Sequence, residues 1–184
     1  MGKIIATMNM TLDGYCDHTS MIADEEIHRH YTELIQNAEA LLYGRITYQL
    51  MEDFWPALVE NPCGDTSMDE FAVAIDDVRK IVFSRTLDGV TWRNSELRKE
   101  IVRDELLEMK RHADRDIFVG SPSAIIAISN LGLVDQYQIG LQPTIAGKGL
   151  ALFGNINKRV DLQLTGTKTF ACGALVLYYQ TCKS

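Results

Sequence analysis

The chain has 184 residues, enough for one domain with a sizeable hydrophobic core, and we expect residues 1–184 to form a single domain. Hydrophobic residues make up 46% of it and charged residues 23%, as is usual in soluble globular proteins. The formal net charge of −7 argues against nucleic acid or an anionic membrane surface as a partner. An anionic ligand would therefore have to meet a local group of basic residues.

Metal binding, disulfides and membrane insertion are not expected either. None of the four cysteines has a C-x-x-C spacing, and His28 and His30 alternate without a third ligand in sight. We interpret the cysteines as reduced thiols, which predicts a cytoplasmic protein. The N-terminus lacks the longer apolar region of a signal peptide, and no apolar run approaches the ~18 residues of a membrane span.

Short apolar runs that are typical of buried strands alternate with segments of helical spacing. The expected strands cover residues 3–8, 39–44, 80–84, 116–120 and 137–143. The expected helices cover residues 24–37, opened by acidic residues, 95–112, with Ser95 as N-cap, and 122–132, with Pro122 in the first turn. This alternation predicts an α/β fold in which helices cover both faces of a mostly parallel sheet, a three-layer α/β/α arrangement.

The C-terminal part follows a different pattern. "RVDLQLTGTKTF" and "GALVLYYQT" alternate in period two on either side of residues 171–173, which predicts a β-hairpin and an antiparallel edge of the sheet. Together with "YQIGLQPTI", this apolar edge suggests a homodimer formed through sheet edges. Residues 54–68 contain two prolines and a glycine and are the expected main irregular loop.

In open α/β sheets, ligands bind beyond the carboxyl ends of the strands, so the segments that follow the strands form the candidate site. In "LLYGRITYQL" (41–50), Gly44 would let a phosphate approach the backbone at the start of a helix. Arg45 adds a positive charge and Thr47 adds a hydroxyl. A strand that simply ends in glycine, with an arginine on the surface, is the alternative.

Two further strand ends have comparable features. In "MTLDGYCD" (10–17), Asp13 and Gly14 predict either a tight turn or a loop that closes over a ligand. In "VFSRTL", Ser84 and Arg85 are suited to a second phosphate, and an ordinary turn is the alternative.

The fourth strand end is "FVGSPSAI". Gly120 and Ser121 lead into a helix that starts at Pro122 or Ser123, which is an arrangement that binds anions or, alternatively, only caps the helix. A pyrophosphate with an additional phosphate would use three of these strand ends together. NADPH has that shape.

The order of these motifs resembles the dihydrofolate-reductase-like superfamily. The chain is most similar to the reductase domain of the riboflavin-biosynthesis deaminase–reductase and its stand-alone bacterial relatives. The matching stretches are "MTLDGY" (10–15), "LLYGRITYQLMEDFWP" (41–56), "VFSRTL" (82–87), "DIFVGS" (116–121), "LGLVDQYQIGLQPTIAGKGLALF" (131–153) and the closing hairpin. They cover essentially the whole chain, and the resemblance implies the fold of this superfamily and NADPH as hydride donor.

The resemblance also implies roles for individual residues. Cofactor phosphates would be held by Gly44, Arg45 and Thr47, and the adenosine 2′-phosphate would be met by Ser84 and Arg85. The pyrophosphate would be bound by Gly120, Ser121 and Ser123. The loop over the nicotinamide would contain Asp13, Gly14 and Tyr15. Two departures from the family stand out. Many relatives have Gly–Gly where this chain has Gly120–Ser121, and many carry a tryptophan where it has Met21 or Ile22, which leaves the substrate open.

Catalysis by hydride transfer needs a placed substrate and usually a proton donor nearby. In dihydrofolate reductases an acid at the start of the first long helix anchors the pterin ring, and "DEEIH" occupies that region here, although it alternatively only caps the helix. The candidate catalytic residues are Asp13, Asp24 and Glu25, and the candidate substrate-binding residues are His28, Tyr31 and Trp55.

The sequence therefore predicts an NADPH-dependent reductase of a small heterocyclic substrate, either 5-amino-6-(5-phosphoribosylamino)uracil or dihydrofolate. A non-catalytic protein that binds NADPH or a pterin in the same cleft stays open, because no unambiguous proton donor is present. The chain has no H-x-E…C-x-x-C motif, so we expect no deaminase activity. A serine hydrolase using Ser121 or Ser123 is disfavoured, because no G-x-S-x-G motif is present.

Overall fold

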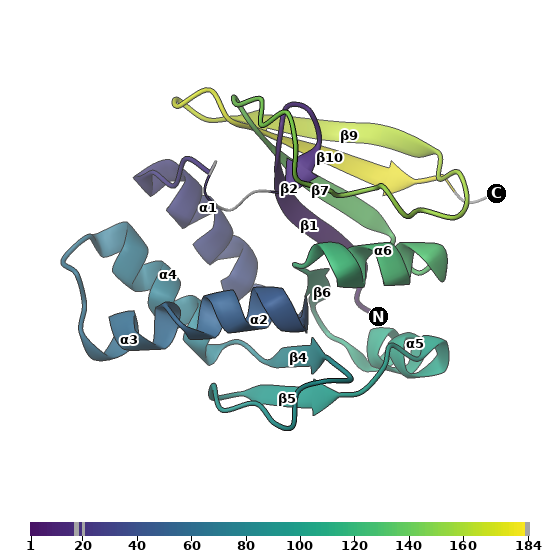
Figure 1. Ribbon diagram of the computed structural model, residues 1–184, viewed down its shortest axis with the longest axis horizontal. Coiled ribbons are helices and arrows are strands. Elements are labelled where there is room, and N and C mark those ends of the chain that lie inside the picture. The colour runs from purple at the N-terminus through teal and green to yellow at the C-terminus, as the bar shows by residue number, and fades with distance from the viewer. Residues whose placement is uncertain (17–18, 20, 183–184) are drawn as a thin grey trace.

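An eight-stranded, mostly parallel sheet runs through the computed structural model, which describes residues 1–16, 19 and 21–182 (Figure 1). The strand order is β5-β4-β3-β6-β1-β7-β10-β9, and β10 runs antiparallel to both of its neighbours. The strands are β1 (Ile4–Thr11), β3 (Ala38–Gly44), β4 (Lys80–Phe83), β5 (Ser95–Arg98), β6 (Asp116–Val119), β7 (Gln136–Gln142), β9 (Leu162–Thr169) and β10 (Leu175–Thr181), with a separate pair of β2 (Tyr15–Cys16) and β8 (Leu150–Ala151).

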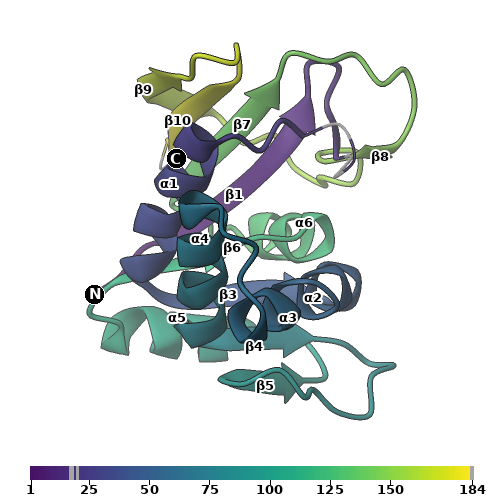
Figure 2. The same ribbon diagram turned by 90° about the vertical axis from the view of Figure 1, so that its left-hand side faces the viewer.

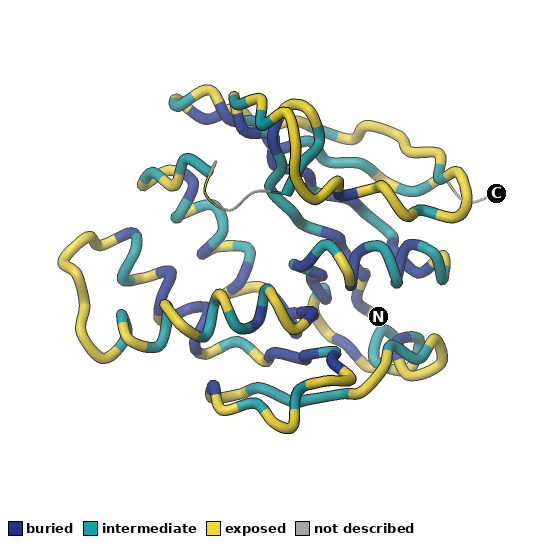
Figure 3. The backbone as a smooth tube through the Cα atoms, in the orientation of Figure 1, coloured by how far each residue is buried: buried dark blue, intermediate teal, exposed yellow. Residues whose placement is uncertain are grey.

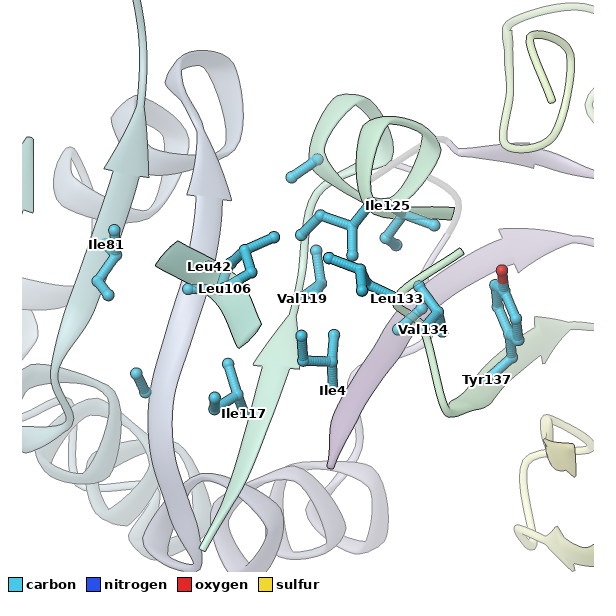
Figure 4. Packing of buried hydrophobic residues seen from close by; sticks show 14 of the residues in the cluster. Ile4, Leu42, Ile81, Leu106, Ile117, Val119, Ile125, Leu133, Val134 and Tyr137 are labelled. Atoms are coloured by element: carbon cyan, nitrogen blue, oxygen red, sulfur yellow. The ribbon is translucent and has the colours of Figure 1, made fainter. Parts of the chain in front are cut away.

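Helices cover both faces of this sheet (Figures 1 and 2). They are α1 (Glu25–Gln36), α2 (Arg45–Glu52), α3 (Trp55–Glu60), α4 (Thr66–Asp77), α5 (Arg103–His112) and α6 (Pro122–Asn130). One hydrophobic cluster packs α1, α2 and α4 against one face through Ile35, Tyr48 and Ile75. The other packs α5 and α6 against the opposite face through Leu106 and Ile125 (Figure 4). The predicted three-layer α/β/α arrangement is confirmed.

Most predicted elements are present. The five predicted strands correspond to β1, β3, β4, β6 and β7, and the predicted C-terminal hairpin is formed by β9 and β10. Gly173 lies in the turn of this hairpin at φ +90°, a conformation that favours glycine. The predicted helices 24–37 and 122–132 correspond to α1 and α6.

The predicted helix over residues 95–112 is wrong at its start. Ser95–Arg98 forms the edge strand β5, which pairs in parallel with β4, and α5 begins only at Arg103. Ser95 fits a helix N-cap when the local sequence is considered alone. Pairing with β4, however, covers the edge of β4 and packs Leu97 against the cluster below α4, so tertiary contacts override the local preference.

The predicted irregular loop over residues 54–68 is also wrong, because it contains α3 and the first residues of α4. Pro56 lies in the first turn of α3, where its missing N–H costs no helical hydrogen bond. Asp65 caps α4 by accepting a hydrogen bond from the Met68 nitrogen at 3.1 Å. Of the residues that suggested a loop, Pro56 therefore marks a helix start, whereas Pro62 and Gly64 do lie in the short connection between α3 and α4.

The structure corrects one premise of the dimer prediction, because only one of its two segments lies at a sheet edge. The "YQIGLQPTI" stretch forms β7, which lies between β1 and β10 and has no free edge. The sheet edges are β5 and β9. Strand β9 is exposed along most of its length (Figure 3), and its Leu162 and Leu164 are 39% and 51% exposed. An edge contact through the C-terminal hairpin, as predicted, would therefore use β9.

A buried lysine holds the end of α4. Lys80 is fully buried, and its Nζ donates hydrogen bonds to the carbonyls of Ile75, Asp76 and Val78 at 2.8, 2.9 and 2.9 Å. Burial lowers the pKa of Lys80 to about 8, which the nearby Asp76 carboxylate opposes. The ammonium group satisfies carbonyls that the end of a helix leaves without partners.

Two further observations concern membrane insertion and metal binding. Among residues 1–16, 19 and 21–182, no helix has the length and apolar character to cross a lipid bilayer. Within the same residues, no three histidine, cysteine, aspartate or glutamate side chains come together as a metal site.

Candidate active site

The central feature of the site is a gap between two neighbouring strands. β1 pairs with β6 only as far as Ala6, but it pairs with β7 to its end. In a parallel strand, alternate residues direct their backbone groups to the same side. The Lys3 carbonyl bonds to β6, so the Thr7 carbonyl and the backbone of Asn9 also face that side. Among the described residues, these backbone groups have no strand partner, and they open onto the gap.

Two helix starts border this gap. Gly44 precedes α2 and Ser121 precedes α6, and the Gly44 nitrogen donates a hydrogen bond to Ser121 Oγ at 2.8 Å. Neither helix has a side-chain cap at its start. The N–H groups of a first helical turn have no partner within the helix, so the two adjoining turns form a site suited to an anion.

The structure shows a packing reason for a glycine at position 44. Its φ is −85°, which any residue adopts. A Cβ atom at this position, however, would lie 2.4 Å from Ser123 Oγ and 3.3 Å from Ser121 Oγ. The glycine therefore allows β3 and the start of α6 to approach each other closely. Gly120 has a similar function, since a Cβ there would lie 2.9 Å from the Tyr43 ring.

The residues predicted to bind phosphate thus divide into two groups. Gly44 and the fully buried Ser121 hydroxyl bond to each other, so they shape the anion site and do not offer free groups to it. The exposed groups are those of Ser123, Thr47 and Arg45 on the first turns of the two helices, with Thr47 partly covered. Arg45 also donates a hydrogen bond to the Gln49 side chain at 3.1 Å.

A cavity of about 360 Å³ connects the end of β4 with the start of α6. The side chains that line it include Ser84, Arg85, Lys99, Glu100 and Ser123. The Arg85 side chain is 81% exposed, and its guanidinium lies 3.9 Å from the Glu100 carboxylate. The cavity therefore places a mobile cation where it can meet an anionic ligand.

Ser84 has a structural role in this loop. Its hydroxyl accepts hydrogen bonds from the nitrogens of Thr86 and Leu87 at 3.2 and 3.1 Å, and the residue is buried. Lys99 donates a hydrogen bond to the Leu87 carbonyl at 2.6 Å and so fixes the loop from the other side. These contacts hold the backbone on which Arg85 stands.

The predicted loop after β1 contains a tight turn. The Gly14 nitrogen donates a hydrogen bond to the Thr11 carbonyl at 2.9 Å, and Gly14 has φ +88°, which favours glycine. Tyr15 then pairs with Ala151 in the small β2–β8 sheet. Asp17, the last residue of the predicted loop, lies outside the described residues.

Asp13, predicted as a catalytic and cofactor-binding residue, is engaged in loop contacts. Its carboxylate accepts hydrogen bonds from Thr11 Oγ1 at 2.6 Å and from the nitrogens of Ala146 and Gly147 at 3.1 and 2.7 Å. These bonds, led by that from Thr11, lower the pKa of Asp13 to about 2. The group is ionised at neutral pH, which disfavours the predicted role as a proton donor.

The two other predicted catalytic carboxylates are also engaged elsewhere. Asp24 is the N-cap of α1 and accepts a hydrogen bond from the Ile27 nitrogen at 2.9 Å. Glu25 is exposed and pairs with Arg29 one turn along the same helix. The alternative in which "DEEIH" caps its own helix therefore describes Asp24 and Glu25 better than a catalytic role does.

His28 and Trp55 lie together, away from β1. Their rings are 6.5 Å apart in a T-shaped arrangement, and His28 Nδ1 lies 3.5 Å from Ser67 Oγ on α4. Burial lowers the pKa of His28, and the carboxylates of Asp65 and Asp24 oppose this shift. Both predicted substrate-binding rings thus belong to the contact between α1, α3 and α4.

Tyr31 is the predicted substrate-binding residue that does reach β1. Its hydroxyl donates a hydrogen bond to Asn9 Oδ1 at 3.0 Å, and burial raises the pKa of Tyr31 to about 12. The sequence interpretation missed Asn9 and its second partner, Gln142. The available signal was a polar amide in the middle of the apolar run "IIATMNMT", which a buried strand does not require.

The fold has counterparts among known proteins. A structure of a putative riboflavin biosynthesis protein from Shewanella sp. PV-4 matches with a TM-score of 0.76 and 16% identity over 98% of this chain and 99% of that one. Dihydrofolate reductase from Enterococcus faecalis, complexed with NADP(H) and RAB-propyl, matches with a TM-score of 0.64 and 12% identity over 99% and 98%. These likenesses confirm the predicted dihydrofolate-reductase-like fold.

The sequence has a relative of the same length. YyaP, an uncharacterized protein of Bacillus subtilis (strain 168), is 27% identical over 183 residues, which are 96% of this chain and 94% of YyaP. The family model of the RibD C-terminal domain matches residues 2–176. The match extends through the gap, both helix starts and most of the C-terminal hairpin, and the chain belongs to the RibD C-terminal domain family.

Proposed function

We propose that the protein is an NADPH-dependent reductase of a small heterocyclic substrate, of the 5-amino-6-(5-phosphoribosylamino)uracil type or the dihydrofolate type. The observation that carries the proposal is the convergence of three features at one edge of the sheet. These features are the unpaired end of β1, the adjoining helix starts of α2 and α6, and the cavity beside Arg85. They complement the carboxamide, the pyrophosphate and the additional phosphate of NADPH, in that order.

Each part of the cofactor has candidate partners. The first turns of α2 and α6 would bind the pyrophosphate with their free N–H groups, beside Arg45 and Ser123. Arg85 would meet the 2′-phosphate with a guanidinium group, which matches phosphate in charge and geometry. The Thr7 carbonyl and the Asn9 backbone would hydrogen-bond to the carboxamide. The bound cofactor supplies a hydride, and the protein supplies binding and orientation.

The structures of related proteins support a reductase as the general class of enzyme. One neighbour is a deaminase and 5-amino-6-(5-phosphoribosylamino)uracil reductase from Thermotoga maritima, with a TM-score of 0.64 and 18% identity over 98% of this chain and 57% of that one. The Enterococcus faecalis enzyme was solved with NADP(H). Membership of the RibD C-terminal domain family is consistent with both substrate types.

A non-catalytic protein that binds NADPH or a pterin is the second candidate. One observation favours it: the carboxylates of Asp13, Asp24 and Glu25 are all engaged in hydrogen bonds or an ion pair within the protein. A reductase would then have to take its proton from another group or from water.

Thermal melting followed by cofactor oxidation tests the proposal. NADPH at a hundredfold excess over its Kd should stabilise the protein by about 2.7 kcal/mol, which is roughly 5–10 °C for a domain of this size. Loss of NADPH absorbance at 340 nm with dihydrofolate or the uracil-type compound would establish the reductase. Stabilisation without oxidation by either compound would favour the binding protein, and no stabilisation by NADPH or NADP⁺ would refute both.

A further inference from the structure

Asn9 stands beside the gap between β1 and β6, which we call the cleft, and its side chain has a fixed environment. It stands on β1 beyond the last pairing with β6, and it is half-buried. Asn9 Oδ1 accepts two hydrogen bonds, one from Tyr31 Oη on α1 at 3.0 Å and one from Gln142 Nε2 on β7 at 3.4 Å. Groups from two other elements therefore hold this amide in place.

A backbone group sets the direction of the whole network. The Ile22 nitrogen lies 3.1 Å from Gln142 Oε1, and a backbone N–H can only donate. Gln142 must therefore turn its oxygen towards Ile22 and its Nε2 towards Asn9. Since Nε2 can only donate as well, Asn9 must turn Oδ1 towards Gln142. The Nδ2 group of Asn9 then points away from both partners.

Gly140 makes room for this arrangement. A Cβ atom on Gly140 would lie 2.0 Å from Asn9 Oδ1 and 3.0 Å from Tyr31 Oη. In the described part of the chain, the buried side-chain polar atom without a partner is His30 Nε2, so Asn9 Nδ2 is not sealed inside the protein. It has no hydrogen-bond partner among the described residues and is accessible from the cleft.

We propose that Asn9 determines substrate specificity by donating a hydrogen bond from Nδ2 to a carbonyl oxygen of the heterocycle. This inference rests on the proposed function, because it concerns the substrate of that same cleft. With two donors fixed on Oδ1, the amide cannot turn over to present its oxygen to the ligand. Asn9 therefore favours an oxo group and disfavours an amino group at the same position of the ring, since two facing donors leave both unpaired.

Two pairs of ligands that differ in one oxo or amino group provide the test. Folic acid and aminopterin form one pair, and uridine 5′-phosphate and cytidine 5′-phosphate form the other. Their Kd values are measured by calorimetry in saturating NADP⁺. The parent protein should bind the oxo compound of at least one pair more tightly than its amino counterpart.

The decisive variant is Asn9→Asp, because a carboxylate still accepts the bonds from Tyr31 and Gln142 but presents a second acceptor to the ligand. The oxo compound should bind about tenfold to a hundredfold more weakly. The amino compound should bind at least as tightly as before, so the preference should reverse. Asn155→Asp makes the same charge change at an exposed position and should leave both Kd values unchanged.

The affinity for NADP⁺ alone separates the two ways of failing. If the parent does not bind NADP⁺, the proposed function fails and this inference fails with it. If NADP⁺ binds but the parent prefers no oxo compound, or Asn9→Asp weakens both members of a pair equally, only the inference about Asn9 is overturned. Tyr31→Phe removes one fixed donor and should reduce the oxo-to-amino preference severalfold. An unchanged ratio would also contradict the inference.

Discussion

Substitution of Arg85 by alanine should reduce the preference for NADPH over NADH. The two cofactors differ by the 2′-phosphate, and Arg85 lines the cavity proposed to receive it. The protein carries a net charge of −7, so the extra phosphate would be repelled without local cations. The Arg85 side chain is 81% exposed, so it should contribute less to the free energy of NADPH binding than a buried charge-assisted hydrogen bond would.

The charges around the cavity determine how much NADPH affinity Arg85→Ala should lose. Arg85, Lys99 and Glu100 together carry a net charge of +1, which becomes 0 without the arginine and +2 without the glutamate. An exposed charge about 4–5 Å from a phosphate is worth about 1 kcal/mol in water, and a hydrogen bond adds up to about the same. Arg85→Ala should thus weaken NADPH by roughly fivefold to thirtyfold, while NADH binding stays nearly constant.

The neighbouring glutamate provides a matched variant of opposite effect. Glu100 lies 3.9 Å from Arg85 and would stand beside the same phosphate. Glu100→Gln removes one negative charge and keeps the shape, so it should raise NADPH affinity by roughly fivefold with little effect on NADH.

Titration of each variant with NADPH and NADH, at low and at physiological salt, checks both effects. Salt should shrink the difference between the cofactors in the parent more than in Arg85→Ala, because exposed charges are screened. An equal loss of affinity for both cofactors would show that Arg85 is structural. A Glu100→Gln variant with unchanged preference would place the 2′-phosphate outside this cavity.

Gly44→Ala should destabilise the fold by about 1–3 kcal/mol, because its Cβ would lie 2.4 Å from Ser123 Oγ. Adding Ser123→Ala should restore the melting temperature but leave NADPH binding weak. Full recovery of NADPH binding in the double variant would contradict a cofactor role for the space beside Gly44. Lys80→Met should lower the free energy of unfolding in urea by about 2–4 kcal/mol, since three carbonyls at the end of α4 lose their donor; an unchanged midpoint would refute this. The folded pKa of Asp13 is about 2 against an ordinary 3.8, so its hold on the 146–147 loop should be complete above pH 4 and lost as the pH falls to about 2. Relative to the intrinsic exchange rate at each pH, Asp13→Asn should show at pH 7 the low protection of the Ala146 and Gly147 amides that the parent shows only in acid, and equal protection in the two proteins at pH 7 would argue against the contact. Leu164→Glu should turn a homodimer into a monomer in light scattering, while a monomeric parent would refute the predicted edge contact.

The fold could be predicted to a large extent because each central strand is a short apolar run between helices of regular spacing. β1, β3 and β6 are buried on both faces, so their sequences report their environment directly. β5 could not be predicted in this way. All four of its side chains are partly buried, so burial does not alternate along it, and it is a strand because it pairs with the edge of β4.

The meeting of two helix starts could be predicted from the sequence, but the hydrogen bonds made there could not. Glycines and serines at strand ends correctly indicated that two helix starts meet at one edge of the sheet. The hydrogen bond between Gly44 and Ser121 joins residues 77 positions apart, and no local pattern shows that each satisfies the other. Asp24 likewise had two possible partners, a ligand and its own helix, and only the backbone geometry decides between them.

The distribution of charge in the site gives a physical reason why the predicted acids have no catalytic geometry. Asp13 and Asp24 each satisfy backbone N–H groups at a turn or a helix start, where a carboxylate is stabilised by its surroundings, and Glu25 pairs with Arg29. The groups that do reach the unpaired part of β1 are the Tyr31 phenol and neutral amides such as Asn9. A buried charge would need a partner to offset its desolvation, whereas the neutral Asn9 amide needs none: its oxygen is hydrogen-bonded within the protein and its Nδ2 group is left for a ligand. Under the proposed function, the cavity beside Arg85 would receive a phosphate, and the neutral groups around Asn9 would receive an uncharged heterocycle that carries oxo groups.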